Sequence, residues 1–362
     1  MLTEDGFLKM QSMSKNIEKN LLDFFKDKWG YAILPPEGLL KPSFPDTFAA
    51  SAFHESVVSA AQKGPNENNH KVGVEWSFRH VDIDKVGVSP IYLSSFRMLV
   101  FFDVYIPTDN DDELRESVIE KFVESVKHVG LDPQNLSATY FGGGEIKGVD
   151  LPADDKVVSL WKKHGVDNIV PITGETNFTN VKRTGEPAGP RCEIFYNHPQ
   201  FSAPVEIGTV VFERYILGKK LNKAKGLVYG GALGIERLAM LQENKNSIFE
   251  SSLLSDGVEI VTKELESQLS PIVRSDVLRL IDALRSLAVI FATINEIPKG
   301  KHRDRINKIT NIAKRSFQAI GIVEKEKIER ITRNVVSTLN LYELESVQAK
   351  NKLTDSIFSL LT

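Results

Sequence analysis

The sequence has a single cysteine, Cys192, and no long apolar run. One cysteine excludes an internal disulfide and a multi-cysteine zinc or iron–sulfur site, and it fits a reducing compartment. The N-terminal segment carries acidic residues from position 4 and lacks the apolar block of a signal peptide or a membrane span. We therefore expect a cytoplasmic protein with no cysteine-based metal site and no membrane partner.

Charge and length leave the partner open. The 45 Lys and Arg residues nearly balance the 48 Asp and Glu residues, and the net charge of −3 creates no general attraction to nucleic acid or to an anionic membrane. The length of 362 residues, 41% of them hydrophobic, is sufficient for two domains with buried cores. Any affinity for a polyanion must come from a local segment.

The spacing of apolar residues predicts a mixed domain followed by a helical one. Residues 15–27 and 111–130 repeat apolar side chains at helical intervals, whereas residues 29–107 form short runs rich in aromatic and β-branched residues. After about residue 232 the signals are long and helical. Further strands are expected at 136–145, 193–197 and 205–216. We predict an α+β fold, with a mostly antiparallel sheet flanked by helices over residues 1–245 and an all-helical domain over residues 246–362.

Two segments combine arginine, glycine and aromatic residues beside predicted strands. The first, at 77–98, holds Arg79, which could bind an anionic oxygen with two N–H groups, and Phe96, which could stack on a base. The second, at 183–197, is a Gly–Pro turn before a strand with Glu193, whose carboxylate could orient a ribose, an ammonium group or a magnesium ion. A surface arginine, a core phenylalanine and an ordinary hairpin explain the same residues.

A third segment, VYGGALGIERLAML at 228–241, predicts a strand, a turn of small residues and a helix that opens with Glu236 and Arg237. It lacks the Gly-Lys-Ser/Thr ending of a Walker loop and the glycine spacing of a dinucleotide-binding fingerprint. Each of the three segments alone is a weak signal.

Taken in order, the segments resemble the class II alanyl-tRNA synthetases, particularly the archaeal-type members. SFRHVDIDKVG followed by YLSSFRM is similar to motif 2 of that family, AGPRCEIFY to its GPC-E-Y turn, VEIGTVVFERY to its EIWN-VF strand, and GGALGIERLAML to its motif 3, DTGMGLER. Residues 46–54 resemble the surroundings of motif 1. Residues 295–315 resemble the helical segment that helps to read the tRNA acceptor stem.

The resemblance implies a core that binds bent ATP, with magnesium bridging its phosphates, and condenses it with a carboxylic acid to an acyl-adenylate. Positioning and preorganised charge suffice for this chemistry. Arg79 is then expected to hold the α-phosphate, Phe96 to stack on adenine, and Arg237 to cover the other face of adenine and contact the γ-phosphate. Arg79 and Arg237 are the catalytic candidates. The expected nucleotide-binding residues are Arg79, Asp82, Phe96, Glu193, Gly234 and Arg237.

The amino-acid pocket departs from the family at each matched position. The family uses a Trp in an NFW segment, the Trp and Asn of EIWN, and the Asp that opens motif 3 and binds the substrate ammonium. The corresponding residues are Thr179, Gly208, Thr209 and Gly230. An ammonium group in a closed pocket without an anion loses several kcal/mol of interaction, so we expect an acid other than alanine. The loss of two indoles favours a bulkier acid, and Glu193 or Glu206 could still receive an amine.

Two further features bear on function. Arg97 replaces the glutamate of the family's FEM segment, close to the expected nucleotide. Residues 299–315 hold seven basic residues and one acidic residue, a local charge of +6. The expected acceptor-binding residues in this segment are Lys299, Lys301, Arg303 and Arg305. A solvated helix face explains the same charges. The family's editing domain, with its His and Cys zinc ligands, and its C-terminal domain are expected to be absent.

These observations favour a stand-alone ligase that adenylates a carboxylic or amino acid, other than alanine, and transfers the acyl group to tRNA, a carrier thiol or an amine. Two alternatives stay open. One is an aminoacyl-tRNA synthetase with altered specificity, including an alanine enzyme whose pocket aligns differently. The other is a non-catalytic module that binds a nucleotide, tRNA or a partner protein as a regulator, which Arg97 and the missing Asp favour. The sequence does not determine the acid, the acceptor or the oligomeric state.

Overall fold

The computed structural model describes residues 16–50, 53–108, 110–265, 270–294, 297–339 and 347–362. These residues separate into two compact units. The first contains the described parts of 1–36, 51–75 and 98–244. The second contains 37–50, 76–97 and the described parts of 245–362.

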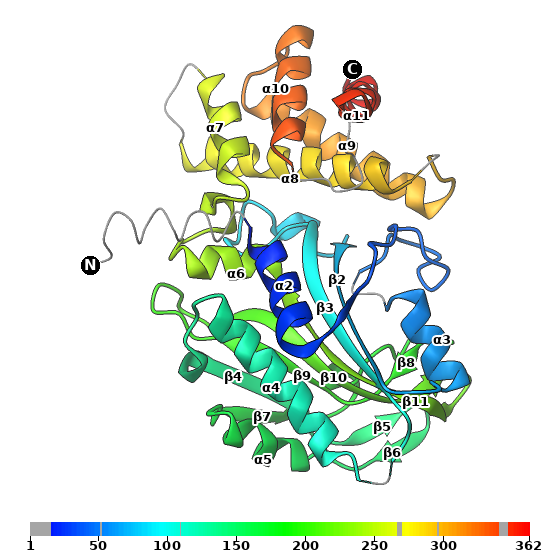
Figure 1. Cartoon of the computed structure of the whole chain (residues 1–362). Coiled ribbons are helices and arrows are strands. Elements are labelled where there is room, and N and C mark those ends of the chain that lie inside the picture. Colours follow the sequence, from blue (N-terminus) through cyan, green and yellow to red (C-terminus); the bar gives the residue numbers. More distant parts are fainter. Residues whose placement is uncertain (1–15, 51–52, 109, 266–269, 295–296, 340–346) are drawn as a thin grey trace. The chain divides into compact units, whose positions relative to one another are not determined.

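A large, mostly antiparallel sheet forms the centre of the first unit (Figure 1). Its order is β1-β2-β3-β11-β10-β9-β4-β7, with β8 paired to β10, and β5 and β6 form a separate hairpin. The pairs from β3 through β11, β10 and β9 to β4 are antiparallel, whereas β1 with β2 and β4 with β7 are parallel. The strands are β1 (Ala32–Ile33), β2 (Asn69–Phe78), β3 (Ser95–Tyr105), β4 (Leu136–Phe141), β5 (Gly144–Ile146), β6 (Val149–Leu151), β7 (Ile169–Ile172), β8 (Pro187–Ala188), β9 (Arg191–Tyr196), β10 (Val205–Leu217) and β11 (Leu221–Gly234).

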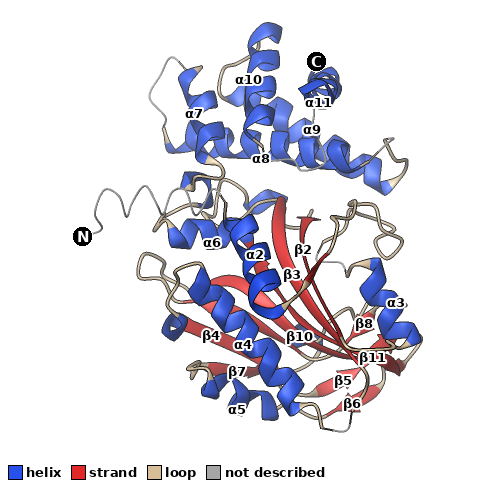
Figure 2. Ribbon diagram, in the orientation of Figure 1, coloured by secondary structure: helices blue, strands red, loops and turns tan. Residues whose placement is uncertain are grey.

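Helices cover one face of this sheet (Figure 2). Phe25 of α2 packs on Phe101 of β3, with 4.7 Å between ring centroids, and Phe122 of α4 packs on Trp161 of α5. The apolar side chains of α4 recur at helical spacing, so that one stripe is buried, as the sequence predicts. The helices of this unit are α2 (Ile17–Trp29), α3 (Glu55–Lys63), α4 (Asp112–His128), α5 (Lys156–Lys163) and α6 (Ile235–Gln242).

The segment GGALG, expected to be a turn, is instead the end of strand β11. Gly230 and Gly231 pair with Val211 and Val210 of β10 on one side, and with β3 on the other. Glycine has little strand preference of its own, but two neighbouring strands fix its backbone here. The chain therefore stays extended up to Gly234, and the helix begins directly at Ile235.

The second unit is helical and is organised around α8, whose central part is buried. Its helices are α7 (Ser255–Lys263), α8 (Pro271–Thr293), α9 (Lys301–Ala319), α10 (Lys325–Thr338) and α11 (Val347–Leu361). Short 3-10 turns occur in both units, namely Ile83–Lys85, Pro133–Asn135, Glu175–Asn177 and Ile248–Glu250. The predicted long helical signals in this region correspond to these helices, while residues 266–269, 295–296 and 340–346 lie outside the described residues.

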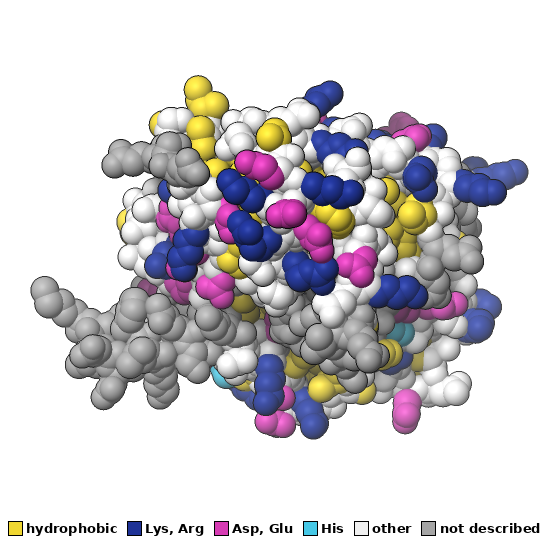
Figure 3. All heavy atoms as spheres, turned by 90° about the horizontal axis from the view of Figure 1, so that it is seen from above, with side chains coloured by type: hydrophobic (Ala, Val, Ile, Leu, Met, Phe, Trp, Pro, Cys, Tyr) yellow, Lys and Arg dark blue, Asp and Glu magenta, His cyan; other side chains and the backbone are white. Residues whose placement is uncertain are grey.

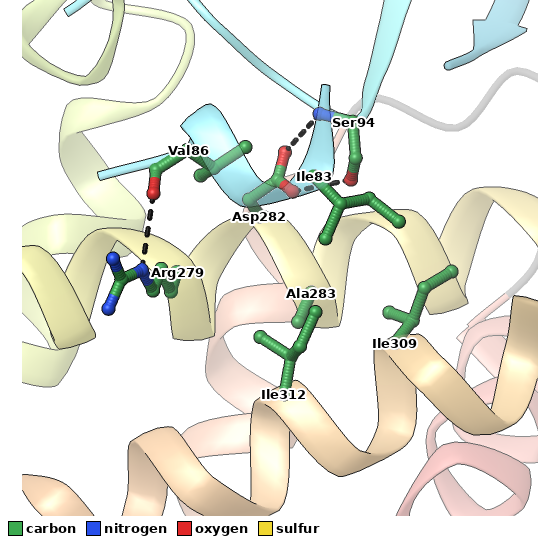
Figure 4. A pocket seen from close by; sticks show the side chains of 8 residues that line it. All are labelled: Ile83, Val86, Ser94, Arg279, Asp282, Ala283, Ile309 and Ile312. Carbon is green, nitrogen blue, oxygen red and sulfur yellow. Dashed lines mark hydrogen bonds between the residues drawn. The ribbon is translucent and has the colours of Figure 1, made fainter. Parts of the chain in front are cut away.

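The segment 76–97 belongs to this helical unit. The Asp282 carboxylate of α8 accepts hydrogen bonds from the backbone N–H of Ser94 (3.0 Å) and from the hydroxyl of Ser94 (Figure 4). The guanidinium group of Arg279, also on α8, donates to the carbonyl of Val86. The space between these groups measures about 10 Å³, room for one water molecule at most. Buried polar contacts thus hold the segment on α8.

The fold class is as predicted: an antiparallel sheet flanked by helices, followed by an all-helical region.

Candidate active site

A pocket of about 430 Å³ lies in the first unit, on the sheet face opposite α4. Side chains alternate between the faces of a strand, so that Val100, Ala232 and Thr209, which are opposite one another in register, share this face. The pocket is of the size that small-molecule ligands occupy. Its lining comes from β3, β9, β10, β11, Phe53 and the segment 175–183.

Two of the predicted substrate residues, Thr179 and Thr209, line this pocket. Thr179 Oγ1 donates to the carbonyl of Gly189 (3.2 Å) and accepts from the N–H of Gly189 (2.9 Å), which fixes its rotamer. Thr209 Oγ1 donates to the carbonyl of Cys192 (3.0 Å). Both hydroxyls are therefore oriented by the backbone of the turn and strand that the sequence singled out.

The pocket contains charges of both signs. Arg191 donates from Nε and Nη2 to the carbonyl of Thr176 (3.0 and 2.7 Å) and forms an ion pair with Glu193 (2.8 Å). Arg183 is paired with Glu186 at 3.5 Å. Glu193, expected in the nucleotide site, thus serves as the partner of Arg191, and it lies opposite Thr209 in the sheet.

Glu213 is a pocket residue that the sequence reading missed. It follows Thr209 and Val211 at two-residue intervals along β10 and lines the pocket with them. Its side chain is fully buried, and this burial raises the pKa of the carboxyl well above its usual range, although the nearby Thr179, Arg191 and Arg183 act in the opposite direction. An acidic residue inside the apolar run VVFERYI was the signal that could have revealed it.

Arg237 is held at the start of β10. Its Nη1 donates to the backbone carbonyl of Glu206 (2.7 Å) and lies 3.5 Å from the carboxylate of the same residue. Gly234 ends the preceding strand, and the nearest atom to a Cβ built there would be 3.7 Å away, at the carbonyl of Ile207. Glu206 therefore positions an arginine and does not line the pocket.

Two predicted pocket positions have no room for a side chain. A Cβ at Gly230 would lie 2.1 Å from the carbonyl oxygen of Phe101 and 2.9 Å from the ring of Phe102. A Cβ at Gly208 would meet Ala232 O at 2.1 Å and the ring of Phe122 on α4 at 3.1 Å. Gly208 thus faces the helix-covered side, and glycine there does not widen the pocket.

The motif 2-like residues lie in the second unit. Asp82 is buried between two cations, Arg79 (Nε to Oδ2, 3.0 Å) and Lys85 (Nζ to Oδ1, 2.9 Å). The Arg79 side chain remains 45% exposed, so its guanidinium is oriented yet open to a ligand. Phe96 is partly buried in β3. The carboxylate of Asp82 therefore serves to orient Arg79.

Arg97, the charge reversal noted in the sequence, is buried against an aromatic ring. Its guanidinium lies 5.3 Å from the centroid of Trp76, and that of Arg285 lies 5.0 Å from the same centroid. Arg285 also donates to the carbonyl of Ser95. Such cation–π contacts stabilise a buried guanidinium, which accounts for an arginine at this position.

The basic segment begins helix α9 and contacts the motif 1-like and motif 2-like segments within the second unit. Lys301 pairs with Asp46 (2.9 Å), Lys308 pairs with Asp84 (3.3 Å), and His302 is hydrogen-bonded to the carbonyl of Thr47 (2.8 Å). Lys299 and Arg303 are exposed, and Arg305 is partly buried. Residues 51–52 of the motif 1-like segment lie outside the described residues.

Acidic and basic side chains mix elsewhere on the helical unit (Figure 3). Arg330 pairs with Glu264 at 2.6 Å, and Arg333 pairs with Asp355 at 3.1 Å. At these positions of the helical unit the opposite charges are thus paired.

Cys192 is buried in β9, where Trp161 Nε1 donates to its sulfur (3.4 Å). Burial raises the pKa of the Cys192 thiol to about 12, so the thiolate is not available as a nucleophile at neutral pH.

Across the described residues, no group of three or more His, Cys, Asp or Glu side chains could hold a metal ion. In the same part of the chain, no helix has the length and apolar character needed to cross a membrane.

Sequence comparison finds alanine–tRNA ligases as relatives. The ligase of Lacticaseibacillus paracasei is 28% identical over 292 residues, which is 70% of this chain and 29% of the relative. The ligase of Bradyrhizobium diazoefficiens is 25% identical in an alignment that covers 85% of this chain and 35% of the relative. The ligase of Bacillus velezensis is 31% identical in an alignment that covers 51% of this chain and 19% of the relative. The chain spans about a quarter to a third of the length of the curated relatives first matched.

No family model matches the chain. A solved pyrrolysyl-tRNA synthetase from Desulfitobacterium hafniense aligns with 66% of this chain and 71% of its own at 9% identity, but its TM-score of 0.39 is too low to support a conclusion.

The antiparallel sheet with its pocketed open face carries the motifs in the order found in class II tRNA ligases, and the relatives matched by sequence are ligases of that kind. The chain is a homologue of the alanine–tRNA ligases, and its sequence fits a paralogue of them.

Proposed function

We propose that this chain activates a carboxylic or amino acid other than alanine with ATP and transfers the resulting acyl group to an acceptor, either tRNA or another molecule. The observation that carries the proposal is the pocket on the open sheet face. It is lined by Thr179 and Thr209, at positions that match the amino-acid site of the related ligases, and position 230 has no space for an aspartate.

ATP would be held by arginines whose guanidinium groups are already fixed. Glu206 orients Arg237, and Asp82 orients Arg79, so neither side chain must be ordered when phosphate binds. In the reaction, an oxygen of the acid's carboxylate attacks the α-phosphorus, and pyrophosphate leaves. Arg79 would neutralise the charge on the α-phosphate in the transition state, while Arg237 would bind the leaving phosphates.

Magnesium does not fit a site made by protein groups alone. The described residues provide no cluster of three ligands, and the Asp82 and Glu193 carboxylates are engaged by Lys85, Arg79 and Arg191. Magnesium commonly binds through substrate phosphates with one or two carboxylates.

The experiment is ATP–pyrophosphate exchange at saturating ATP with a panel of carboxylic and amino acids. We expect exchange with at least one acid and none above background with alanine. Exchange with alanine as the best substrate would contradict the proposed specificity. An absence of exchange with every acid, together with no ATP binding by calorimetry, would favour a non-catalytic binding module instead.

A further inference from the structure

Glu213 stands at one end of the pocket, on strand β10. Its side chain points to the same face as those of Thr209 and Val211, because the three residues are two positions apart. Glu206, which holds Arg237, lies seven positions earlier on the strand, a distance of about 23 Å at the usual rise of a strand. Glu213 is therefore far from the arginine expected at the nucleotide.

The Glu213 carboxyl has no partner that satisfies its hydrogen-bonding capacity. Its side chain is fully buried, and neither of its oxygens has a hydrogen bond within the described part of the chain. The nearby hydroxyl of Thr179 is already used by the backbone of Gly189. A buried carboxyl left in this condition is costly, so it indicates a group that the protein itself does not supply.

The neighbouring charges show what kind of group is missing. The pocket guanidinium groups of Arg191 and Arg183 have their own acidic partners, Glu193 and Glu186. Arg191 and Arg183 are near enough to lower the pKa of Glu213, but among the described residues no Lys or Arg donates a hydrogen bond to its carboxyl. A ligand that brings another anion would find these arginines engaged, whereas an ammonium group would supply both the charge and the N–H donors that Glu213 lacks.

We propose that Glu213 determines specificity by receiving a protonated amine, carried by the substrate at the end remote from the carboxylate that is activated. This inference rests on the proposed function, which puts the nucleotide, and hence the activated carboxylate, at the Arg237 end. The substrate class is therefore an amino acid with an amine on its side chain or at its far end. Glu213 then supplies the negative charge of the pocket. It lies on the strand next to that of Gly230, a position with no space for an acidic side chain.

The test compares two acids that differ in this amine alone. Lysine and norleucine have the same four-carbon stem, and lysine adds the terminal ammonium group. We expect ATP–pyrophosphate exchange in the unaltered protein to favour lysine over norleucine by about 100-fold in kcat/KM, because a site built for a donor rejects the analogue without it. Ornithine against norvaline repeats the comparison with a shorter stem.

Glu213→Gln should reduce this preference to less than about tenfold, because the amide keeps the shape of the side chain but loses its charge. Glu145→Gln, the same change at an exposed residue of β5, is the matched control and should keep the preference. Thermal unfolding of both variants checks that the fold is intact.

The outcomes separate this inference from the proposed function. Exchange that is equal for lysine and norleucine, or faster with norleucine, would overturn the inference and leave adenylation standing. If no acid supports exchange, calorimetry decides. Lysine that binds the unaltered protein at least about tenfold more tightly than Glu213→Gln would support the role of Glu213 without adenylation. Equal binding, or none, would overturn it.

Discussion

Glu206 and Asp82 hold the two arginines that are proposed to bind ATP. The backbone carbonyl of Glu206 accepts a hydrogen bond from the guanidinium group of Arg237, and the carboxylate of Asp82 forms an ion pair with that of Arg79. A preorganised arginine stabilises developing phosphate charge without first losing side-chain entropy. The carboxylates are therefore positioning residues, and the arginines are the groups expected to contact the nucleotide.

Arg237→Ala is expected to lower ATP–pyrophosphate exchange by at least about 100-fold in kcat/KM, because the charge-assisted contacts to the leaving phosphates are lost. Exchange with the best acid of the panel measures the effect. Arg274→Ala is the matched control, since Arg274 forms an exposed ion pair with Glu250 on the helical unit. Equal exchange rates in Arg237→Ala and the control would show that Arg237 does not contact the nucleotide.

His80 provides a pH-dependent signal beside α9. Burial, followed by the positive charges of Arg305 and Lys308, lowers the pKa of His80 below its usual value of 6.5. A histidine whose pKa is lower in the folded state stabilises the fold above the unfolded pKa, and this contribution is lost as the pH falls through the folded pKa. Acidification below about pH 6.5 should thus weaken the fold through His80.

Arg305→Gln should raise the pKa of His80, because it removes a nearby positive charge. Titration of the His80 ring protons by NMR measures the change directly. Lys263→Gln, which alters an exposed ion pair on α7, is the control and should leave the titration as it is. An unchanged His80 titration in Arg305→Gln would show that Arg305 does not act on this histidine.

At the scale of elements, the spacing of β3 and β11 decides what the pocket can contain. Phe102 and Val100 of β3 face Gly230 and Ala232 of β11 in register. The carbonyl of Phe101 occupies the space that a side chain at 230 would need. A substitution there must displace backbone, which is more costly than moving the end of a flexible side chain.

Gly230→Asp should lower the free energy of unfolding by about 1–3 kcal/mol, the usual cost of overpacking. It should not create exchange with alanine. Urea denaturation measures the stability, and Gly234→Ala on the same strand is the control, because its Cβ has 3.7 Å of clearance. If Gly230→Asp were as stable as the control, β3 would be able to move away from position 230 at little cost in free energy.

At the scale of the whole molecule, the net charge of −3 hides a local excess of positive charge. Part of that excess is neutralised within the helical unit, where Lys301 and Lys308 bind Asp46 and Asp84. The exposed side chains of Lys299 and Arg303 are candidates for contact with an acceptor. Phosphate contacts of this kind give an affinity that falls with salt.

If the acceptor is tRNA, Arg303→Glu should weaken tRNA binding by about tenfold and reduce the slope of log K against log salt by about one. ATP–pyrophosphate exchange should remain within about twofold of the unaltered protein. Filter binding at several salt concentrations measures the slope, with Lys220→Glu in the β10–β11 turn as the charge-matched control. Equal loss of exchange and of tRNA binding would contradict this division of roles.

The sequence predicts well where local pattern decides the structure. The apolar spacing of residues 111–130 anticipates α4, and the alternation in residues 205–216 anticipates β10, because each pattern matches the period of its element. The antiparallel sheet and the helical second part follow from such patterns.

Non-local contacts decide the rest. A β-bulge between Glu206 and Gly208 sets which face Gly208 takes, and the pairing of β11 with two strands turns an expected loop into strand. Ser94 joins the helical unit through Asp282, 188 positions away. The proposed role of Glu213 depends on the neighbouring strands and the segment 175–183 that enclose it, and the sequence of β10 alone does not show these contacts.

The closest neighbour of a side chain at Gly230 is a carbonyl oxygen, and this has a consequence for evolution and for engineering. Substrate specificity that depends on side chains alone can revert through single substitutions. Here the exclusion of an acidic residue is built into the path of the backbone, so trimming Phe102 alone would not restore it. With this strand spacing, an aspartate at position 230 requires β3 to move away from β11.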